Sequence, residues 1–166
     1  MELVIISDTH VKSRAPAIPE WVKQMVESAD HVIHAGDFDS RPAYEEIAAL
    51  ADQLTAVAGN MDRALDLPAV ATVGLGGVRF VVTHGQGPED GYRERVLEIV
   101  DEHAAETGLT VGISGHTHRV LDTECDGYRL LNPGSATAAW PAQEATLFTA
   151  TVSEGTLSVD IHRETD

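Results

Sequence analysis

The sequence predicts an α/β fold in which two mixed β-sheets pack as a sandwich flanked by helices. Up to about Leu109, short apolar runs alternate with helical patterns, which indicates parallel strands joined by crossover helices. Beyond that point the helical patterns stop and two hairpin-like segments follow, which indicates antiparallel pairing. The chain has 166 residues, 43% of them hydrophobic, and contains no repeat or linker. We therefore expect a single domain over residues 1–166.

Each expected element follows from its own pattern. Runs of apolar and β-branched residues predict strands, and these lie at residues 2–6, 31–35, 54–58, 78–83, 110–114, 128–131 and 145–152. Apolar residues at helical spacing predict three helices, at residues 19–28, 41–51 and 91–108. Ser40 suits the N-cap of the second helix, and Gly108 the end of the third. The expected hairpin turns are Asp126–Gly127 and Glu154–Gly155.

The charge balance is strongly acidic, with 27 acidic residues against 11 basic ones and a formal net charge of −16. Such a surface repels nucleic acid backbones, so we expect no long nucleic acid as a partner. Only two of the basic residues are lysines, Lys12 and Lys23, and acidic residues are spread along the whole chain. This pattern favours a halophilic, archaeal source with a salt-rich cytosol. An ordinary acidic surface is the alternative interpretation.

The sequence contains few signals that indicate a cellular compartment. No apolar run approaches the roughly 20 residues needed to cross a bilayer. Residues 1–10 carry neither the basic region nor the cleavage signal of a secretory peptide. The single cysteine, Cys125, excludes an intrachain disulfide. We expect a cytoplasmic protein with no membrane partner.

Five predicted strands are each followed directly by side chains that can bind a metal ion. In order along the chain they are Asp8 and His10, Asp37, Asn60, His84, and His116 with His118. Ligands of open α/β sheets gather beyond the carboxyl ends of the strands, so these seven side chains should converge at one edge. Glycines, which allow close backbone approach, adjoin them at Gly36, Gly59, Gly85 and Gly115.

Four histidines, two aspartates and an asparagine exceed the needs of one tetrahedral zinc ion. They suit two divalent ions with mixed nitrogen and oxygen ligands, with manganese preferred over nickel, iron or zinc. We expect Asp37 to bridge the ions, and with a bridging hydroxide the centre keeps a net charge of about +1. Such a centre attracts a phosphate ester and supplies the hydroxide as nucleophile, which predicts phosphoester hydrolysis.

The blocks D-x-H, G-D, G-N, H and G-H-x-H, from Ser7 to about Ser135, resemble the calcineurin-like metallophosphoesterase family. The short chain and the NPGSAT stretch at residues 132–137 resemble its small bacterial and archaeal phosphodiesterase branch, which is similar to the retromer subunit Vps29. The resemblance implies the two-sheet sandwich and hydrolysis of small phosphodiesters, with phosphomonoesters as further substrates.

The same resemblance implies a role for each matching residue. One metal ion would be held by Asp8, His10, Asp37 and His118. The other would be held by Asp37, Asn60, His84 and His116, which are also the residues expected to act in catalysis.

Met61 departs from the family pattern, because many members follow the asparagine with a histidine that assists the leaving group. Methionine cannot donate a proton, so we expect a hydrolase that favours good leaving groups such as aryl esters. The alternative is a Vps29-like binding scaffold with weak or no catalysis, although the complete ligand set favours an enzyme. With no inserted cap domain, specificity is expected from residues 11–19 and 61–69, with a role for a neighbouring copy in a homo-oligomer.

Several residues outside these blocks have structural or alternative interpretations. His34 is interpreted as structural, like His31, His103 and His162. Asp62 either orients a ligand or is an exposed loop carboxylate. Residues 132–135 form a simple turn or support the metal edge through backbone amides. Three arginines follow ligand blocks and either grip phosphate or form local ion pairs, namely Arg14, Arg41 and Arg63.

Overall fold

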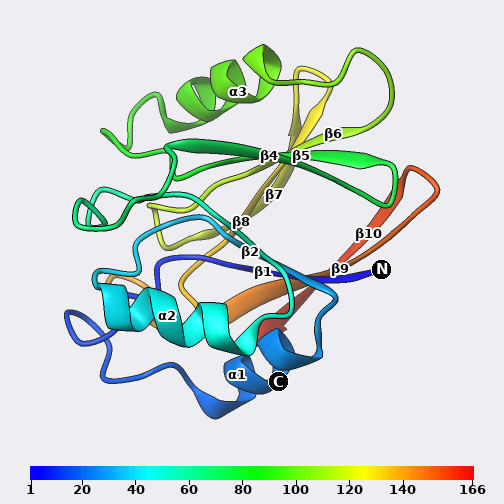
Figure 1. The fold of residues 1–166 in the computed structure, drawn as a ribbon. Helices are drawn as coiled ribbons and strands as arrows, with labels where there is room; N and C mark the ends of the chain where they lie inside the picture. The colour runs from blue at the N-terminus through cyan, green and yellow to red at the C-terminus, as the bar shows by residue number, and fades with distance from the viewer.

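Residues 1–166 are described by a computed structural model, in which ten strands form two five-stranded mixed sheets packed face to face (Figure 1). The first sheet, in the order β10-β9-β1-β2-β3, contains β1 (Glu2–Ile6), β2 (His31–His34), β3 (Leu54–Ala56), β9 (Thr146–Ser153) and β10 (Thr156–Arg163). The second, in the order β4-β5-β6-β8-β7, contains β4 (Val70–Leu75), β5 (Val78–Thr83), β6 (Thr110–Ile113), β7 (Val120–Cys125) and β8 (Tyr128–Pro133).

Three helices complete the sandwich. Helices α1 (Glu20–Ser28) and α2 (Arg41–Leu50) connect the parallel strands β1, β2 and β3, and α3 (Tyr92–Glu102) connects the parallel strands β5 and β6. In Figure 1, α1 and α2 cover the outer face of the first sheet and α3 covers the second. None of the three helices is long and apolar enough to pass through a bilayer. The predicted α/β sandwich flanked by helices is confirmed.

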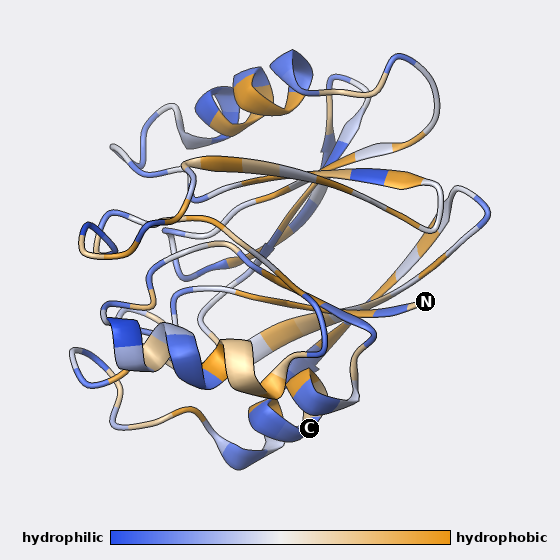
Figure 2. Ribbon diagram, viewed as in Figure 1, coloured by the Kyte–Doolittle hydropathy of each residue, from blue (hydrophilic) through white to orange (hydrophobic).

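Apolar side chains fill the spaces between these layers, and Figure 2 shows hydrophobic residues concentrated in the strands. The central cluster lies between the two sheets and includes Ile5, Ile33, Phe80, Ile113 and Leu131. A second cluster joins the first sheet to α1 and α2, and a smaller one lies beneath α3. Burial of these clusters keeps the two sheets in a constant relative position, so the loops at their ends meet in a defined geometry.

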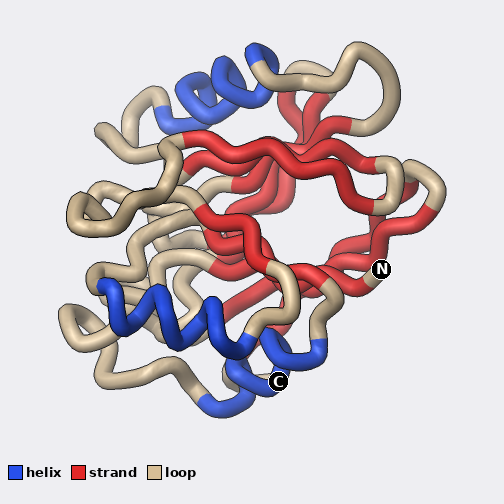
Figure 3. The backbone as a smooth tube through the Cα atoms, viewed as in Figure 1, coloured by secondary structure: helices blue, strands red, loops and turns tan.

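The parallel strands of both sheets end on the same side of the molecule, where many loops gather at the left of Figure 3. The opposite side carries tight hairpin turns. Asp126–Gly127 and Glu154–Gly155 lie at two of them, as predicted, with φ between 49° and 86°. Positive φ at both turn residues is the geometry that matches the twist of a two-residue hairpin.

The largest differences from the sequence prediction are one missed strand and the end of one helix, while other element ends differ by one or two residues. Strand β4 was not predicted, because its sequence VATVGL mixes small and polar residues on an edge strand that pairs only with β5. Helix α3 ends at Glu102 instead of continuing to Gly108. His103 caps the helix, and the backbone N–H of Ala105 donates to Thr110 Oγ1 at 3.1 Å, so the chain already turns toward β6 there.

Candidate metal centre

The seven predicted ligands meet at the edge formed by the carboxyl ends of the parallel strands. They follow β1 (Asp8, His10), β2 (Asp37), β3 (Asn60), β5 (His84) and β6 (His116, His118). Five of them are buried, whereas Asn60 is exposed and His116 is half-buried. One side of the cluster is therefore closed within the protein and the other faces solvent.

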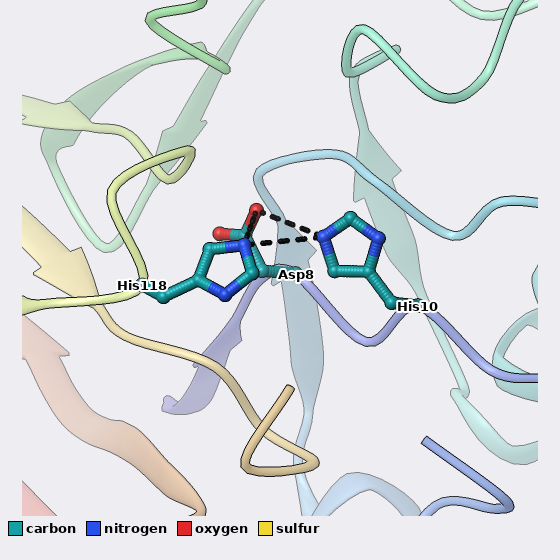
Figure 4. Close-up of side chains that lie close together, drawn as sticks. All are labelled: Asp8, His10 and His118. Atoms are coloured by element: carbon teal, nitrogen blue, oxygen red, sulfur yellow. Dashed lines mark hydrogen bonds and ion pairs between the residues drawn. The ribbon is translucent and has the colours of Figure 1, made fainter. Parts of the chain in front are cut away.

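Asp8, His10 and His118 form the closed half of the cluster, and Figure 4 shows their polar atoms pointing toward one another. Asp8 Oδ1 lies 3.6 Å from His10 Nε2 and 3.3 Å from His118 Nε2. The two imidazole nitrogens are 3.2 Å apart. Asp8 Oδ1 is buried and has no hydrogen-bond partner. A buried carboxylate oxygen without a donor is costly, and a cation at this point would satisfy it.

Asp37, Asn60, His84 and His116 form the more open half. His84 Nε2 lies 3.1 Å from Asp37 Oδ2 and 3.1 Å from Asn60 Oδ1. The same Asn60 oxygen is 3.2 Å from His116 Nδ1. Asp37 Oδ2 also lies 3.4 Å from His10 Nε2. This single oxygen therefore stands between the two halves, which is the position a bridging ligand would need.

The outward-facing nitrogen of each of the four imidazoles contacts an oxygen acceptor. The pairs are His10 Nδ1 with Asp39 (2.8 Å), His84 Nδ1 with Ala35 O (2.7 Å), His116 Nε2 with Gly87 O (2.9 Å) and His118 Nδ1 with Ala139 O (2.8 Å). In a neutral ring this pairing puts the proton on the outer nitrogen and leaves a lone pair on the inner one. Lone pairs and carboxylate oxygens thus converge, and this donor set fits divalent cations with mixed nitrogen and oxygen ligands.

Charges within the cluster shift the ionisation of its members. Burial alone would raise the pKa of Asp8, but the contacts with His10 and His118 outweigh burial and hold that pKa far below its usual range. Burial lowers the pKa of His10, but the hydrogen bond to Asp39 and the nearby carboxylates of Asp8 and Asp37 outweigh it and raise the pKa to about 9. Asp8 thus stays charged, and without a cation a proton on His10 offsets part of that negative charge.

Backbone strain coincides with these residues. Five of the seven have φ between 42° and 72°, namely Asp8, His10, Asp37, His116 and His118. Non-glycine residues rarely adopt this left-handed region, and they do so where surrounding contacts enforce it, often at functional sites. The predicted need for close backbone approach also holds at two glycines. A Cβ at Gly59 would overlap the Asp37 carboxylate, and one at Gly115 would overlap Ser7 Oγ.

Two carboxylates outside the set of predicted ligands, Asp62 and Asp39, maintain this geometry through hydrogen bonds. Asp62 is buried, so its interpretation as an exposed loop residue is wrong. Its Oδ2 accepts the backbone N–H groups of Asp37 at 2.7 Å and Gly59 at 2.9 Å, and its Oδ1 accepts that of Asp39 at 2.8 Å. Asp39 was not identified from the sequence. The available signal was a second carboxylate two residues after Asp37.

The NPGS segment supports the centre through side chains, in contrast to the backbone amides considered from the sequence. Asn132 Nδ2 donates to Gly115 O at 2.8 Å and lies 3.0 Å from Tyr92 Oη. Ser135 Oγ donates to the backbone oxygen of Asp8 at 2.7 Å. Both side chains are fully buried. They tie the loops after β1 and β6 to β8, which sets the distance between Asp8 and the GHTH segment.

The remaining histidines lie outside the cluster, as expected. His34 is buried, stacks on Phe38 with ring centroids 3.6 Å apart, and accepts the backbone N–H of Gly36 through Nδ1. Burial lowers its pKa to about 3, so the ring is neutral. The other three contact hydrogen-bond partners elsewhere, namely His31, His103 and His162. Of the arginines considered, Arg14 and Arg41 donate to backbone oxygens instead of forming ion pairs.

A two-sheet sandwich with buried carboxylates and imidazoles at its strand ends defines a protein with a candidate centre for divalent metal ions. Residues 1–155 match the model of the calcineurin-like phosphoesterase superfamily domain, and the chain belongs to that superfamily. A probable metallophosphoesterase from Methanothermobacter thermautotrophicus is 34% identical over 139 residues, which cover 82% of this chain and 78% of that protein.

Solved structures share the fold. A single mutant of Vps29 from Entamoeba histolytica superimposes with a TM-score of 0.80 at 22% identity, covering 98% of this chain and 99% of that one. Wild-type Vps29 of the same organism, complexed with Zn²⁺, gives a TM-score of 0.72 at 24% identity, with 98% and 99% coverage. At this level of identity the likeness establishes the architecture alone.

Proposed function

We propose that this chain is a metal-dependent phosphoesterase that hydrolyses small phosphodiesters, and phosphomonoesters in addition, at a pair of divalent ions. The observation that carries the proposal is the convergence of imidazole lone pairs on the unpartnered Oδ1 of buried Asp8. Membership of the calcineurin-like phosphoesterase superfamily supports the same reaction class. The relative named as a probable metallophosphoesterase supports it further.

The two halves of the cluster divide the ligands between the ions. Asp8, His10, Asp37 and His118 would hold one ion, and Asp37, Asn60, His84 and His116 the other. Manganese suits this mixture best, with nickel, iron and zinc as alternatives. A Vps29 with this fold has been solved in complex with Zn²⁺, so a protein of this architecture can bind a divalent ion.

A bound pair of ions would supply an activated water as nucleophile and would neutralise charge on the phosphate. The side chains of the cluster would set the positions of the ions and of the phosphate. Asp37 Oδ2 lies between both halves and would keep the ions together. Asn60 and His116 stand on the solvent side, where a phosphate can approach. His84 has its Nδ1–H held by Ala35 O, so the lone pair on its Nε2 would be available to the second ion.

Met61 limits the range of esters. It follows Asn60 at the open side, is 44% exposed, and its backbone N–H donates to Asp37 Oδ1 at 2.9 Å. A thioether cannot protonate a departing alkoxide. A general acid contributes on the order of 10²–10⁴-fold, so aryl esters, whose leaving groups need no proton, should react far faster than alkyl esters.

The direct test is hydrolysis of bis(p-nitrophenyl) phosphate and p-nitrophenyl phosphate by the purified chain with Mn²⁺, Ni²⁺, Zn²⁺ or a chelator, in dilute buffer and in multimolar KCl. We expect activity with metal only, and loss of at least a hundredfold in Asn60→Ala and His116→Ala. His162→Ala, at a histidine outside the cluster, is the matched control. High salt should raise activity if the net charge of −16 reflects a salt-rich cytosol.

A binding scaffold is the second candidate, favoured by the structural likeness to Vps29. In that case the same assay would show no hydrolysis above background with any metal, while the folded chain would still bind metal. If hydrolysis persisted in both alanine variants, a contaminating enzyme would account for the activity, and the proposal would be wrong.

A further inference from the structure

A cleft of about 450 Å³ opens beside the metal cluster. One wall is the segment of residues 58–70, between β3 and β4. The other is formed by the end of β5, the following residues Gly85 and Gln86, and the α3 side chains Arg95 and Ile99. Asn60 and His84 line it as well, so it is continuous with the open half of the cluster. Its volume lies within the range of small-molecule sites, about 300–1,000 Å³.

The lining of this cleft is partly apolar, in a chain whose formal net charge is −16. Apolar side chains line it at Leu65, Leu67, Val70 and Ile99, together with two alanines. Its one carboxylate, Asp62, is buried and accepts three backbone N–H groups. Three other hollows of the surface contain exposed acidic residues such as Glu89, Glu94 or Asp101. The cleft at the metal edge is therefore free of exposed carboxylates that would repel an anion.

Two arginines give the cleft a positive character. Four of the eleven basic residues form ion pairs with carboxylates, and neither cleft arginine is among them. Arg63 is exposed at the rim. Arg95 donates to Gly85 O at 3.0 Å and Pro88 O at 2.9 Å, while its Nε is buried without a partner. An anion that approaches the centre through the cleft would meet uncompensated positive charge.

We propose that this cleft binds one organic arm of the phosphoester, an aromatic group the size of a phenyl ring or a nucleobase, while the phosphate lies at the metal edge. The proposal rests on the proposed function, since it assigns the specificity of the same site. Apolar walls favour burial of a flat ring. Arg63 contributes charge attraction for the phosphate without selecting the arm.

Ala69 provides the sharpest test, because it is exposed, lines the cleft and is not one of the seven predicted ligands. Ala69→Trp should fill the cleft, whereas Ala69→Ser keeps it open and serves as the matched control. Binding of phenylphosphonate and methylphosphonate to the Mn²⁺-loaded protein is measured by calorimetry. We expect the parent chain and Ala69→Ser to prefer phenylphosphonate at least tenfold, and Ala69→Trp to bind both with equal affinity. The affinity for methylphosphonate should stay within twofold among the parent chain and the two Ala69 variants.

The variant Arg63→Gln separates the charge attraction for the phosphonate from the fit of the aromatic ring in the cleft. It should weaken both phosphonates by a similar factor and leave their ratio unchanged. Equal affinities in the parent chain, or a preference that survives Ala69→Trp, would overturn the proposal. If the parent chain prefers phenylphosphonate but hydrolyses no ester, the proposed function fails and the cleft stands as an aryl-phosphonate binding site. If neither phosphonate binds, the cleft proposal is overturned, and hydrolysis of the p-nitrophenyl esters alone decides the proposed function.

Discussion

The Nε2 atoms of His10 and His118 lie 3.2 Å apart beside Oδ1 of Asp8, while the Nδ1 atom of each ring contacts an oxygen acceptor. At most one proton can lie between the two nitrogens, and Asp8 Oδ1 has no hydrogen-bond donor at all. One divalent cation would satisfy all three atoms at once. Without a cation, a proton on His10 offsets only part of the negative charge on Asp8, so the stability of the fold should depend on whether metal is bound.

Metal binding should therefore stabilise the fold. At a concentration 100 times its Kd, a ligand that binds only the folded state adds about 2.7 kcal/mol. We expect Mn²⁺ to raise the melting temperature by several degrees over the chelated protein, as measured by calorimetry at constant ionic strength. His118→Ala should abolish most of this rise. An unchanged melting temperature in the parent chain would contradict the metal centre.

Asp39 should matter for metal affinity although we do not count it among the ligands. Its carboxylate holds Nδ1 of His10 at 2.8 Å and so keeps Nε2 directed inward. Outer partners of this kind are worth 10- to 100-fold in affinity, on the order of 1–3 kcal/mol. Asp39→Ala should weaken Mn²⁺ binding by that factor in a titration. Asp122→Ala, which breaks only the surface pair with Arg129, should leave it unchanged.

Asp62→Ala should be among the most destabilising single changes at this edge. Its carboxylate accepts three backbone N–H groups, and each buried donor left unpaired costs about 1–3 kcal/mol. We expect a marked fall in the urea midpoint, together with weaker metal binding because the Asp37 loop loosens. A midpoint equal to that of the parent chain would show that water replaces the carboxylate.

Gly115 and Gly74 form a matched pair of glycines. A Cβ at Gly115 would overlap Ser7 Oγ and crowd Asp8 Oδ2, whereas at Gly74 it would meet open space. Gly115→Ala should cost about 1–3 kcal/mol of stability by overpacking and lower metal affinity. Gly74→Ala should be neutral within about 1 kcal/mol. Equal effects of the two substitutions on unfolding would show that steric contact at Gly115 is relieved by small shifts.

His34 should give the fold a dependence on pH. Its pKa is about 3 in the folded protein against an ordinary value of 6.5, so the unfolded chain binds a proton that the folded chain excludes. Stability should therefore fall as the pH decreases from 6.5 toward 3, by about 1.4 kcal/mol per pH unit. Between pH 6.5 and 5, urea unfolding of His34→Gln should lose about 1.6 kcal/mol less than the parent chain, because the histidine of the unfolded chain is only half protonated at pH 6.5. Equal losses would mean that His34 titrates normally in the fold.

Much of the fold follows from local patterns. Signals that act over a few neighbouring residues can be predicted from the sequence. They include the strand and helix periodicities, the Ser40 cap and the two hairpin turns. Strand β4 was missed because its pattern is weak and its pairing with β5 supplies what its own residues lack. The end of α3 was misplaced because the turn at Ala105 depends on Thr110, which the helical pattern does not reveal.

For the candidate site, the sequence alone determined which side chains follow the strands, because strand ends and metal-capable residue types are local properties. The order of these residues along the chain also indicated the family. The tertiary structure decided how those side chains face one another. It supplied Asp39, Asp62 and the backbone oxygens that orient each imidazole, and it opened the cleft between residues 58–70 and α3. These contacts join residues 20 or more positions apart, and only packing of the two sheets brings such distant segments within hydrogen-bond distance.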